Sequence, residues 1–183
     1  MQGALRPYHA TAGPSSVRCA RCCDPRDEGS SWHGLLVPGS WSLDGNPCTD
    51  PAVVAHSPTL HMNVSGVAEL GKLANDAAAR AHIKNILTFS NGATVQPLKY
   101  GAVTIHGRHF VTGVIVVKEA TAGDPDFQVG QTILREELVT ANAGSIYEFQ
   151  ANYLLTDAAK TVQQEATLVT SIFNTIVISK PAK

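Results

Sequence analysis

The spacing of apolar residues changes at Met62. Residues 1–61 contain no apolar repeat of about 2 or 3.6 residues that extends beyond a few positions. A segment of this kind buries too little apolar surface to offset the entropy that it loses on ordering. We therefore expect residues 1–61 to be an irregular, largely disordered leader and residues 62–183 to form one compact domain, with Met62 as an alternative start of the protein.

The first periodic segment after Met62 predicts an amphipathic helix. Its apolar residues recur every three or four positions, which places them on one face of a helix. Ser65 can cap the start of this helix, and the Asn-Gly pair at residues 91–92 is a turn signal shortly after Leu87. We therefore expect one helix from Ser65 to about Leu87. The apolar stripe of this helix consists of Val67, Leu70, Ala74, Ala77 and Ala81.

The remainder of the chain has the patterns of β-strands. Residues 108–118 form a β-branched run in which Gly113 predicts a bulge or bend. Residues 127–139 and 147–155 alternate apolar and polar side chains, as expected for strands with one solvated face. A final β-branched stretch covers residues 166–178 and predicts another strand.

One or two weaker strands between residues 93 and 106 bring the expected total to five or six antiparallel strands. A helix that precedes such a meander can bury its apolar stripe when the sheet curls around it. The predicted class is therefore α+β, with one N-terminal helix packed on a curled antiparallel sheet.

Composition and charge argue against several kinds of partner. The chain has 14 Lys and Arg against 15 Asp and Glu, and both parts of it are nearly balanced. Nucleic acids and anionic membranes normally select a basic face, so we expect neither as a partner. No apolar stretch approaches the roughly 18 residues of a membrane span. No signal peptide is visible either, which favours a cytoplasmic protein.

All four cysteines lie in the predicted leader and leave three interpretations open. Cys19 and Cys22 form a Cys-x-x-Cys pair, which can present two thiolates to zinc. A structural zinc site usually has a second clean pair, which Cys23 and Cys48 do not form. The thiols can also form a disulfide or remain free. We expect free thiols, with no metal ion or other cofactor.

Three short segments, residues 70–74, 103–107 and 147–148, together resemble plant-type cystatins. Residues 70–74 are similar to the helix signature of that family, residues 103–107 occupy the place of its inhibitory hairpin loop, and residues 147–148 resemble the start of its next strand. The resemblance implies a cystatin-like fold and a loop that enters the cleft of a papain-type cysteine protease. The residues of this implied protease-binding loop are Val103, Thr104, Ile105, His106 and Gly107.

Two other functions stay open. A sheet curled into a cone, as in nuclear-transport-factor-like proteins, leaves a pocket for a small ligand or for catalysis. The candidate acids and bases of such a pocket are Asp76, His82, Glu148 and Tyr153. Long strands rich in Thr, Val and Ala also suit a virion or filament subunit that assembles through sheet edges. We expect a non-catalytic protein-binding role, with a cysteine protease or a second copy of the chain as the partner.

Overall fold

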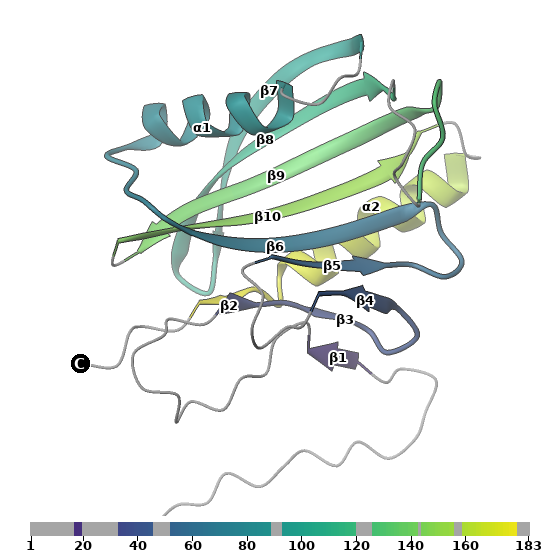
Figure 1. Ribbon diagram of the computed structural model, residues 1–183, viewed down its shortest axis with the longest axis horizontal. Helices are drawn as coiled ribbons and strands as arrows, with labels where there is room; N and C mark the ends of the chain where they lie inside the picture. Colours follow the sequence, from purple (N-terminus) through teal and green to yellow (C-terminus); the bar gives the residue numbers. More distant parts are fainter. Residues whose placement is uncertain are drawn as a thin grey trace, which may run out of the picture.

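A seven-stranded antiparallel sheet is the centre of the structure, with the strand order β4-β5-β6-β10-β9-β8-β7 (Figure 1). Its strands are β4 (Ser42–Asp44), β5 (Ala52–His56), β6 (Met62–Leu70), β7 (Ala93–Ile105), β8 (Arg108–Lys118), β9 (Thr132–Asn142) and β10 (Ser145–Leu154). The computed structural model describes residues 17–19, 33–45, 52–88, 93–119, 126–142, 144–155 and 159–178.

Alternate side chains of β10 point to opposite sides of the sheet, and each side packs against a different helix. Ile146 and Leu154 pack in the cluster that contains the buried residues of α1 (Asp76–Thr88). Phe149 points to the other side and packs with α2 (Ala159–Phe173). The helices therefore cover opposite faces of the sheet, which we call the α1 face and the α2 face (Figure 1). Neither helix, in the part of the chain that the structure describes, is long and apolar enough to cross a membrane.

Four short strands outside the main sheet form two further antiparallel pairs. β1 (Val17–Cys19) pairs with β3 (Leu36–Pro38), and β2 (His33–Gly34) pairs with β11 (Val177–Ile178). The second pair connects the chain ahead of β4 to the chain that follows α2. The described strands β1 to β5 all come from the segment that the sequence analysis assigned to the leader.

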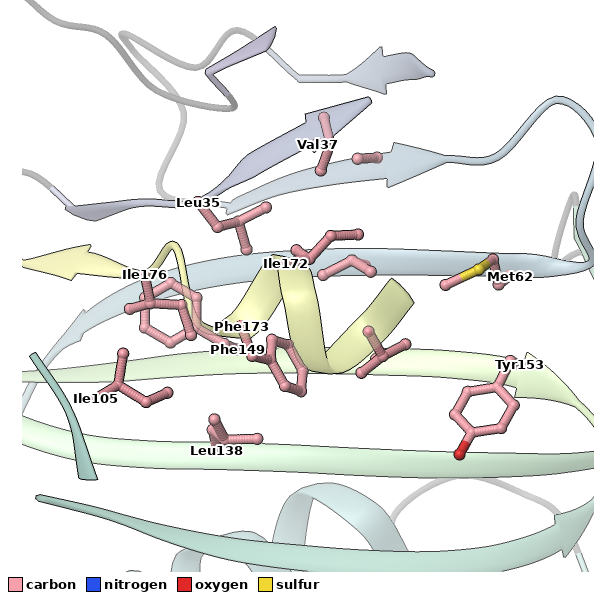
Figure 2. Packing of buried hydrophobic residues seen from close by; sticks show 14 of the residues in the cluster. Leu35, Val37, Met62, Ile105, Leu138, Phe149, Tyr153, Ile172, Phe173 and Ile176 are labelled. Carbon is pink, nitrogen blue, oxygen red and sulfur yellow. The ribbon is translucent and has the colours of Figure 1, made fainter. Parts of the chain in front are cut away.

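Residues ahead of Met62 contribute to the core of the fold. Leu35, Val37 and Trp41 are at most 3% exposed and join the apolar cluster of the α2 face. Figure 2 shows Leu35 and Val37 in this cluster. Burial of one such side chain stabilises a fold by about 1.5–3 kcal/mol. The N–H of Leu36 also donates a hydrogen bond to Thr175 Oγ1 at 2.7 Å, beside the end of α2. The described residues 33–45 are therefore part of the folded unit.

The prediction about the four cysteines falls largely outside the described residues. Cys19 is the last residue of β1. Cys22, Cys23 and Cys48 lie outside the part of the chain that the structure describes, and so does the start of the predicted leader, residues 1–16.

The predicted helix from Ser65 to Leu87 is wrong over its first half. Residues 62–70 form β6, which pairs with β5 on one side and with β10 on the other. Pairing along both edges of a strand outweighs a local helical pattern. In addition, Gly66 disfavours a helix by about 1 kcal/mol. Leu70, a member of the predicted apolar stripe, is 92% exposed.

The second half of that prediction is correct, because α1 begins at Asp76. Asn75 caps it, with the N–H of Ala78 donating to Asn75 Oδ1 at 3.0 Å. The negative charge of Asp76 in the first turn also suits the positive end of the helix dipole. The side chains of α1 that are buried against the sheet are Ala79, Ile83 and Leu87.

The predicted strand over residues 166–178 is wrong, because most of this segment lies in α2. Its hydroxyl and β-branched residues, which suggested a strand, are compatible with a helix when their hydroxyls bond to carbonyls one turn back. Thr170 Oγ1 does so, donating to the carbonyl oxygen of Ala166 at 2.9 Å. The buried apolar residues of α2 recur three or four positions apart. They include Val169, Ile172 and Phe173.

Two other strands are where the pattern placed them. β8 coincides with residues 108–118, and β10 covers nearly all of residues 147–155 with the predicted alternation. The bulge expected at Gly113 is absent, because the register of β8 with β9 continues through this residue. A Cβ at Gly113 would lie 2.3 Å from Ile83 Cγ2. This glycine therefore serves the close packing of α1 on the sheet.

The predicted fold class, one N-terminal helix packed on a curled sheet of five or six strands, is wrong. The main sheet has seven strands, and two helices cover its opposite faces. The error follows from two segments that were assigned the wrong period, since β6 was predicted as helix and α2 as strand.

Candidate functional site

The β7 edge of the main sheet is its most exposed regular element. β7 has 13 residues, and most of them are exposed to solvent. The opposite edge strand, β4, has only 3 residues. A long exposed edge presents unpaired N–H and C=O groups to a further strand.

The two halves of β7 differ in regularity. Its pairing with β8 shifts between Thr94 and Gln96 and again between Gln96 and Lys99, around Pro97. Prolines and bulges are features that protect an edge from additional strands. From Lys99 to Ile105 the register is continuous, and Lys99 is the one charged residue of β7. The C-terminal half of β7 is therefore the unprotected half.

Apolar side chains flank this half of β7 on both faces of the sheet. Tyr100 is 39% exposed and lies opposite Gly113, on the α1 face, with the Arg80 guanidinium 5.7 Å from its ring centroid. Val103 is 38% exposed and lies opposite Phe110, on the α2 face. An added strand would therefore find an apolar neighbour on either side.

The residues of the predicted protease-binding loop lie at the end of this edge. Val103, Thr104 and Ile105 are the last residues of β7, and His106 and Gly107 form a two-residue turn with positive φ values of 49° and 75°. Positive φ at both positions is the geometry of a tight hairpin that follows the twist of its strands.

This hairpin turn is attached to the body of the protein. The imidazole Nε2 of His106 donates to the carbonyl oxygen of Asn174, just after α2, at 2.9 Å. Ile105 is 5% exposed and packs in the cluster of the α2 face. The turn is therefore short and tied down on one side, unlike a freely projecting wedge.

The turn also determines which backbone groups of β7 point outward. In a two-residue hairpin the flanking pair, here Ile105 and Arg108, exchanges hydrogen bonds, and such pairs alternate along an antiparallel ladder. Val103 and Gly101 are then bonded to β8. The N–H and C=O groups that point away from the sheet belong to Tyr100, Ala102 and Thr104.

A second polar region lies on the α1 face, where α1 leaves β5, β6 and β10 uncovered. A hollow of about 290 Å³ opens there. His56 Nδ1 lies 2.5 Å from Asp126 Oδ2, and Asn63 donates to the same oxygen at 2.7 Å. His56 Nε2 lies 3.2 Å from Asp44 Oδ2 without the angle of a hydrogen bond. The residues that line the hollow are Asp44, Val54, His56, Asn63, Ser65, Gln150 and Asn152.

His82 is the centre of a second cluster of polar side chains on the same face. Its Nε2 lies 2.5 Å from Glu148 Oε1 and 3.7 Å from Glu69 Oε1. The three side chains offer ligand atoms within 4.8 Å of one another, which makes them the candidate metal ligands of the described residues. Glu137 is buried nearby, and its pKa is raised well above 4.5 by burial and, secondly, by the charge of Glu148.

The four candidate acids and bases from the sequence do not form one site. His82 and Glu148 are in contact, but Asp76 lies at the start of α1, where its Oδ1 is 3.1 Å from His109 Nε2. Tyr153 is on the α2 face, and burial raises its pKa to about 12, with smaller contributions from nearby carboxylates. The His82–Glu148 pair was not recognised in the sequence because 66 residues separate its members.

The fold is similar to known structures, although no protein-family model and no curated protein sequence matches the chain. The solution structure of cyanobacterial PsbP (CyanoP) from Synechocystis sp. PCC 6803 matches with a TM-score of 0.59 and 17% identity, covering 97% of this chain and 100% of that one. The Ran-binding protein Mog1p from Saccharomyces cerevisiae matches with a TM-score of 0.50 and 11% identity, covering 84% of this chain and 97% of that one.

These similarities correct the cystatin interpretation. The expected cystatin-like fold is wrong, because the architecture is that of the PsbP and Mog1p structures. The assignment as a protease inhibitor, which depended on that fold, is withdrawn with it. Residues 70–74, the supposed helix signature, are the end of β6 and the connection to α1.

Proposed function

We propose that the chain is a non-catalytic protein-binding module that adds an extended strand of a protein partner to the C-terminal half of β7. The observation that carries this proposal is the long, exposed edge with continuous register from Lys99 to Ile105. In strand addition, main-chain hydrogen bonds supply affinity and alternate side chains supply specificity.

Both requirements have counterparts on this edge. Tyr100, Ala102 and Thr104 offer outward main-chain groups, as the hairpin geometry requires. Tyr100 and Val103 offer apolar contacts on opposite faces of the sheet. The yeast protein of similar fold is described as Ran-binding, which supports a protein-binding use of this architecture without identifying the partner of this chain.

A binding role is favoured over catalysis by the placement of the titratable residues. Of the four acids and bases that the sequence singled out, only His82 and Glu148 are in contact. Their contact joins α1 to β10, and the remaining two residues lie elsewhere on the fold.

The proposal is tested with an Ala102→Pro variant. Proline removes the outward N–H of residue 102 and leaves the ladder with β8 intact, since proline is tolerated at outward-facing positions of edge strands. Ala102→Val is the matched control, because it retains the N–H and is compatible with a strand. Both variants are compared with the native chain by circular dichroism to show that they fold.

Two binding measurements distinguish the possible sources of the partner strand. Sedimentation velocity over a range of concentrations detects a second copy of the chain, and selection from a random peptide display library detects extended segments of other proteins. We expect at least one assay to show binding that Ala102→Pro weakens by about tenfold or more and Ala102→Val retains. Absence of binding in both assays, or equal binding by the proline variant, contradicts the proposal.

A further inference from the structure

Glu69, His82 and Glu148 come together from three different elements of the fold. Glu69 of β6 lies opposite Ile146 of β10, so it is the diagonal neighbour of Glu148 on the α1 face. Diagonal neighbours in a sheet are within reach of long side chains. His82 projects from α1 beside the buried Ile83 and reaches the same place from above the sheet.

The spacing of these side chains is close to that of metal ligands. Nitrogen and oxygen ligands about 2.0–2.2 Å from a tetrahedral ion lie roughly 3.3–3.5 Å from one another. His82 Nε2 is 2.5 Å from one carboxylate and 3.7 Å from the other, so the observed distances bracket this value. The side chains of His82 and Glu148 are 21% and 13% exposed, whereas that of Glu69 is 48% exposed. Two ligands are thus held in place and the third can adjust by rotation.

The buried Glu137 supplies a second, independent observation at this place. Its side chain is 1% exposed, and neither carboxyl oxygen has a hydrogen-bond partner of good geometry among the described residues. In the sheet, Glu137 lies opposite Gln150 and is the diagonal neighbour of Glu148 on the α1 face. Glu137, Glu148 and Glu69 therefore lie on three neighbouring strands along one diagonal of the α1 face, and a cation between Glu148 and Glu69 would offset the repulsion between their carboxylates.

We propose that Glu69, His82 and Glu148 bind a divalent transition-metal ion of the Zn²⁺ or Mn²⁺ class. One imidazole and two carboxylates form a ligand set that suits these ions, and three protein ligands leave at least one position for water or a further ligand. The site lies on the α1 face and is independent of the β7 edge. It links α1 to β6 and β10 through three side chains.

The test is zinc titration of the full chain, prepared free of metal, by isothermal titration calorimetry. The variants are His82→Ala and Glu148→Gln. His109→Ala is the matched control, because His109 also lies near α1 but pairs with one carboxylate among the described residues, Asp76, and has a side chain that is 55% exposed. Comparison with this control removes the contribution of zinc bound by cysteines or other histidines.

We expect His82→Ala and Glu148→Gln each to weaken one class of zinc site by at least about tenfold, and His109→Ala to leave it unchanged. If His82→Ala does not fold, Glu148→Gln still decides the question, since the amide keeps the shape of the side chain. Zinc should also raise the thermal stability of the native chain and not that of Glu148→Gln. Equal zinc affinity in the native chain and both variants, or no binding by the native chain, reduces the cluster to an ion pair and overturns the proposal.

Discussion

The two faces of the main sheet are covered to different extents. On the α2 face, α2 and the segment around Val37 enclose a core that reaches from Met62 to Ile176 (Figure 2). On the α1 face, the helix packs over β8 and β9, and the strands β5, β6 and β10 carry polar residues, most of which are partly exposed. Successive residues of one strand therefore have different roles according to the face on which they lie.

Within a single strand, the residues of the α2 face therefore contribute to the core, and those of the α1 face carry the polar groups. Along β10, Phe149, Ala151 and Tyr153 are buried on the α2 face, whereas Glu148 and Gln150 point to the α1 face. The polar residues of this face are tolerated because other polar side chains contact them: Glu148 contacts His82 of α1, and Asn63 donates to Asp126. The candidate metal site and the polar hollow both lie on this face.

Trp41→Ala should have the largest effect, because it opens the closed face. Trp41 is 3% exposed and belongs to the core of the α2 face. Truncation of a buried aromatic side chain leaves a cavity, and we expect the free energy of unfolding to fall by about 3–5 kcal/mol. Chemical denaturation followed by circular dichroism measures this loss.

Leu70→Ala is the control for that experiment. Leu70 is also a large apolar residue at the end of a strand, but it is 92% exposed. We expect a change within about 0.5 kcal/mol. A similarly small effect of Trp41→Ala would show that Trp41 does not stabilise the core of the α2 face.

The sequence pattern predicted an element correctly where the spacing of apolar residues fits a strand and does not also fit a helix. β8 and β10 were predicted correctly because β8 is a β-branched run and β10 alternates apolar and polar residues, and neither pattern fits a helix equally well. α2 was predicted as a strand because the segment contains β-branched residues such as Ile172, although its buried residues have helical spacing. Attention to the period of Val169, Ile172 and Phe173 would have found it.

Other features depend on contacts that no local pattern contains. β6 is a strand because β5 and β10 pair with it, and β10 is paired to it across more than 70 positions of sequence. Trp41 is a single apolar residue in an irregular segment, so its burial leaves no periodic signal. The His82–Glu148 contact likewise joins residues from different elements. Topology, more than composition, determines these parts of the structure.

Gly113→Ala should have an intermediate effect, confined to the α1 face. The added Cβ would lie 2.3 Å from Ile83 Cγ2, so the helix or the side chain must shift. Overpacking of this kind costs about 1–3 kcal/mol of unfolding free energy. The measurement is again chemical denaturation.

A double-mutant cycle with Ile83→Ala identifies the cause of that loss. Removal of the Ile83 side chain makes room for the Cβ at position 113, so Gly113→Ala should cost less in the Ile83→Ala background, with a coupling of about 0.5–3 kcal/mol. Additive effects would mean that the glycine is needed for its backbone and not for the approach of α1.

Of the three substitutions, Glu137→Gln should change the free energy of unfolding least at low pH. This change should grow as the pH rises. Burial and the charge of Glu148 raise the pKa of Glu137 well above its ordinary value of 4.5. The folded chain therefore retains this proton at pH values where the unfolded chain has released it. Between pH 4.5 and the raised pKa, the stability of the native chain falls as pH rises, by up to about 1.4 kcal/mol per pH unit. Gln cannot ionise, so the variant lacks this decline.

The measurement is the free energy of unfolding by chemical denaturation over a range of pH. Glu136→Gln is the control, and it extends the comparison to the α2 face. Glu136 lies on the α2 face, opposite Ala151, and is half-buried, with a pKa that burial also raises but to a smaller extent. Its replacement should therefore flatten the pH dependence less than Glu137→Gln does. A constant difference between Glu137→Gln and the native chain at every pH would mean that Glu137 ionises as easily in the folded chain as in the unfolded one. The uncovered part of the α1 face would then solvate this carboxyl, and the contrast between the two faces would not extend to their charges.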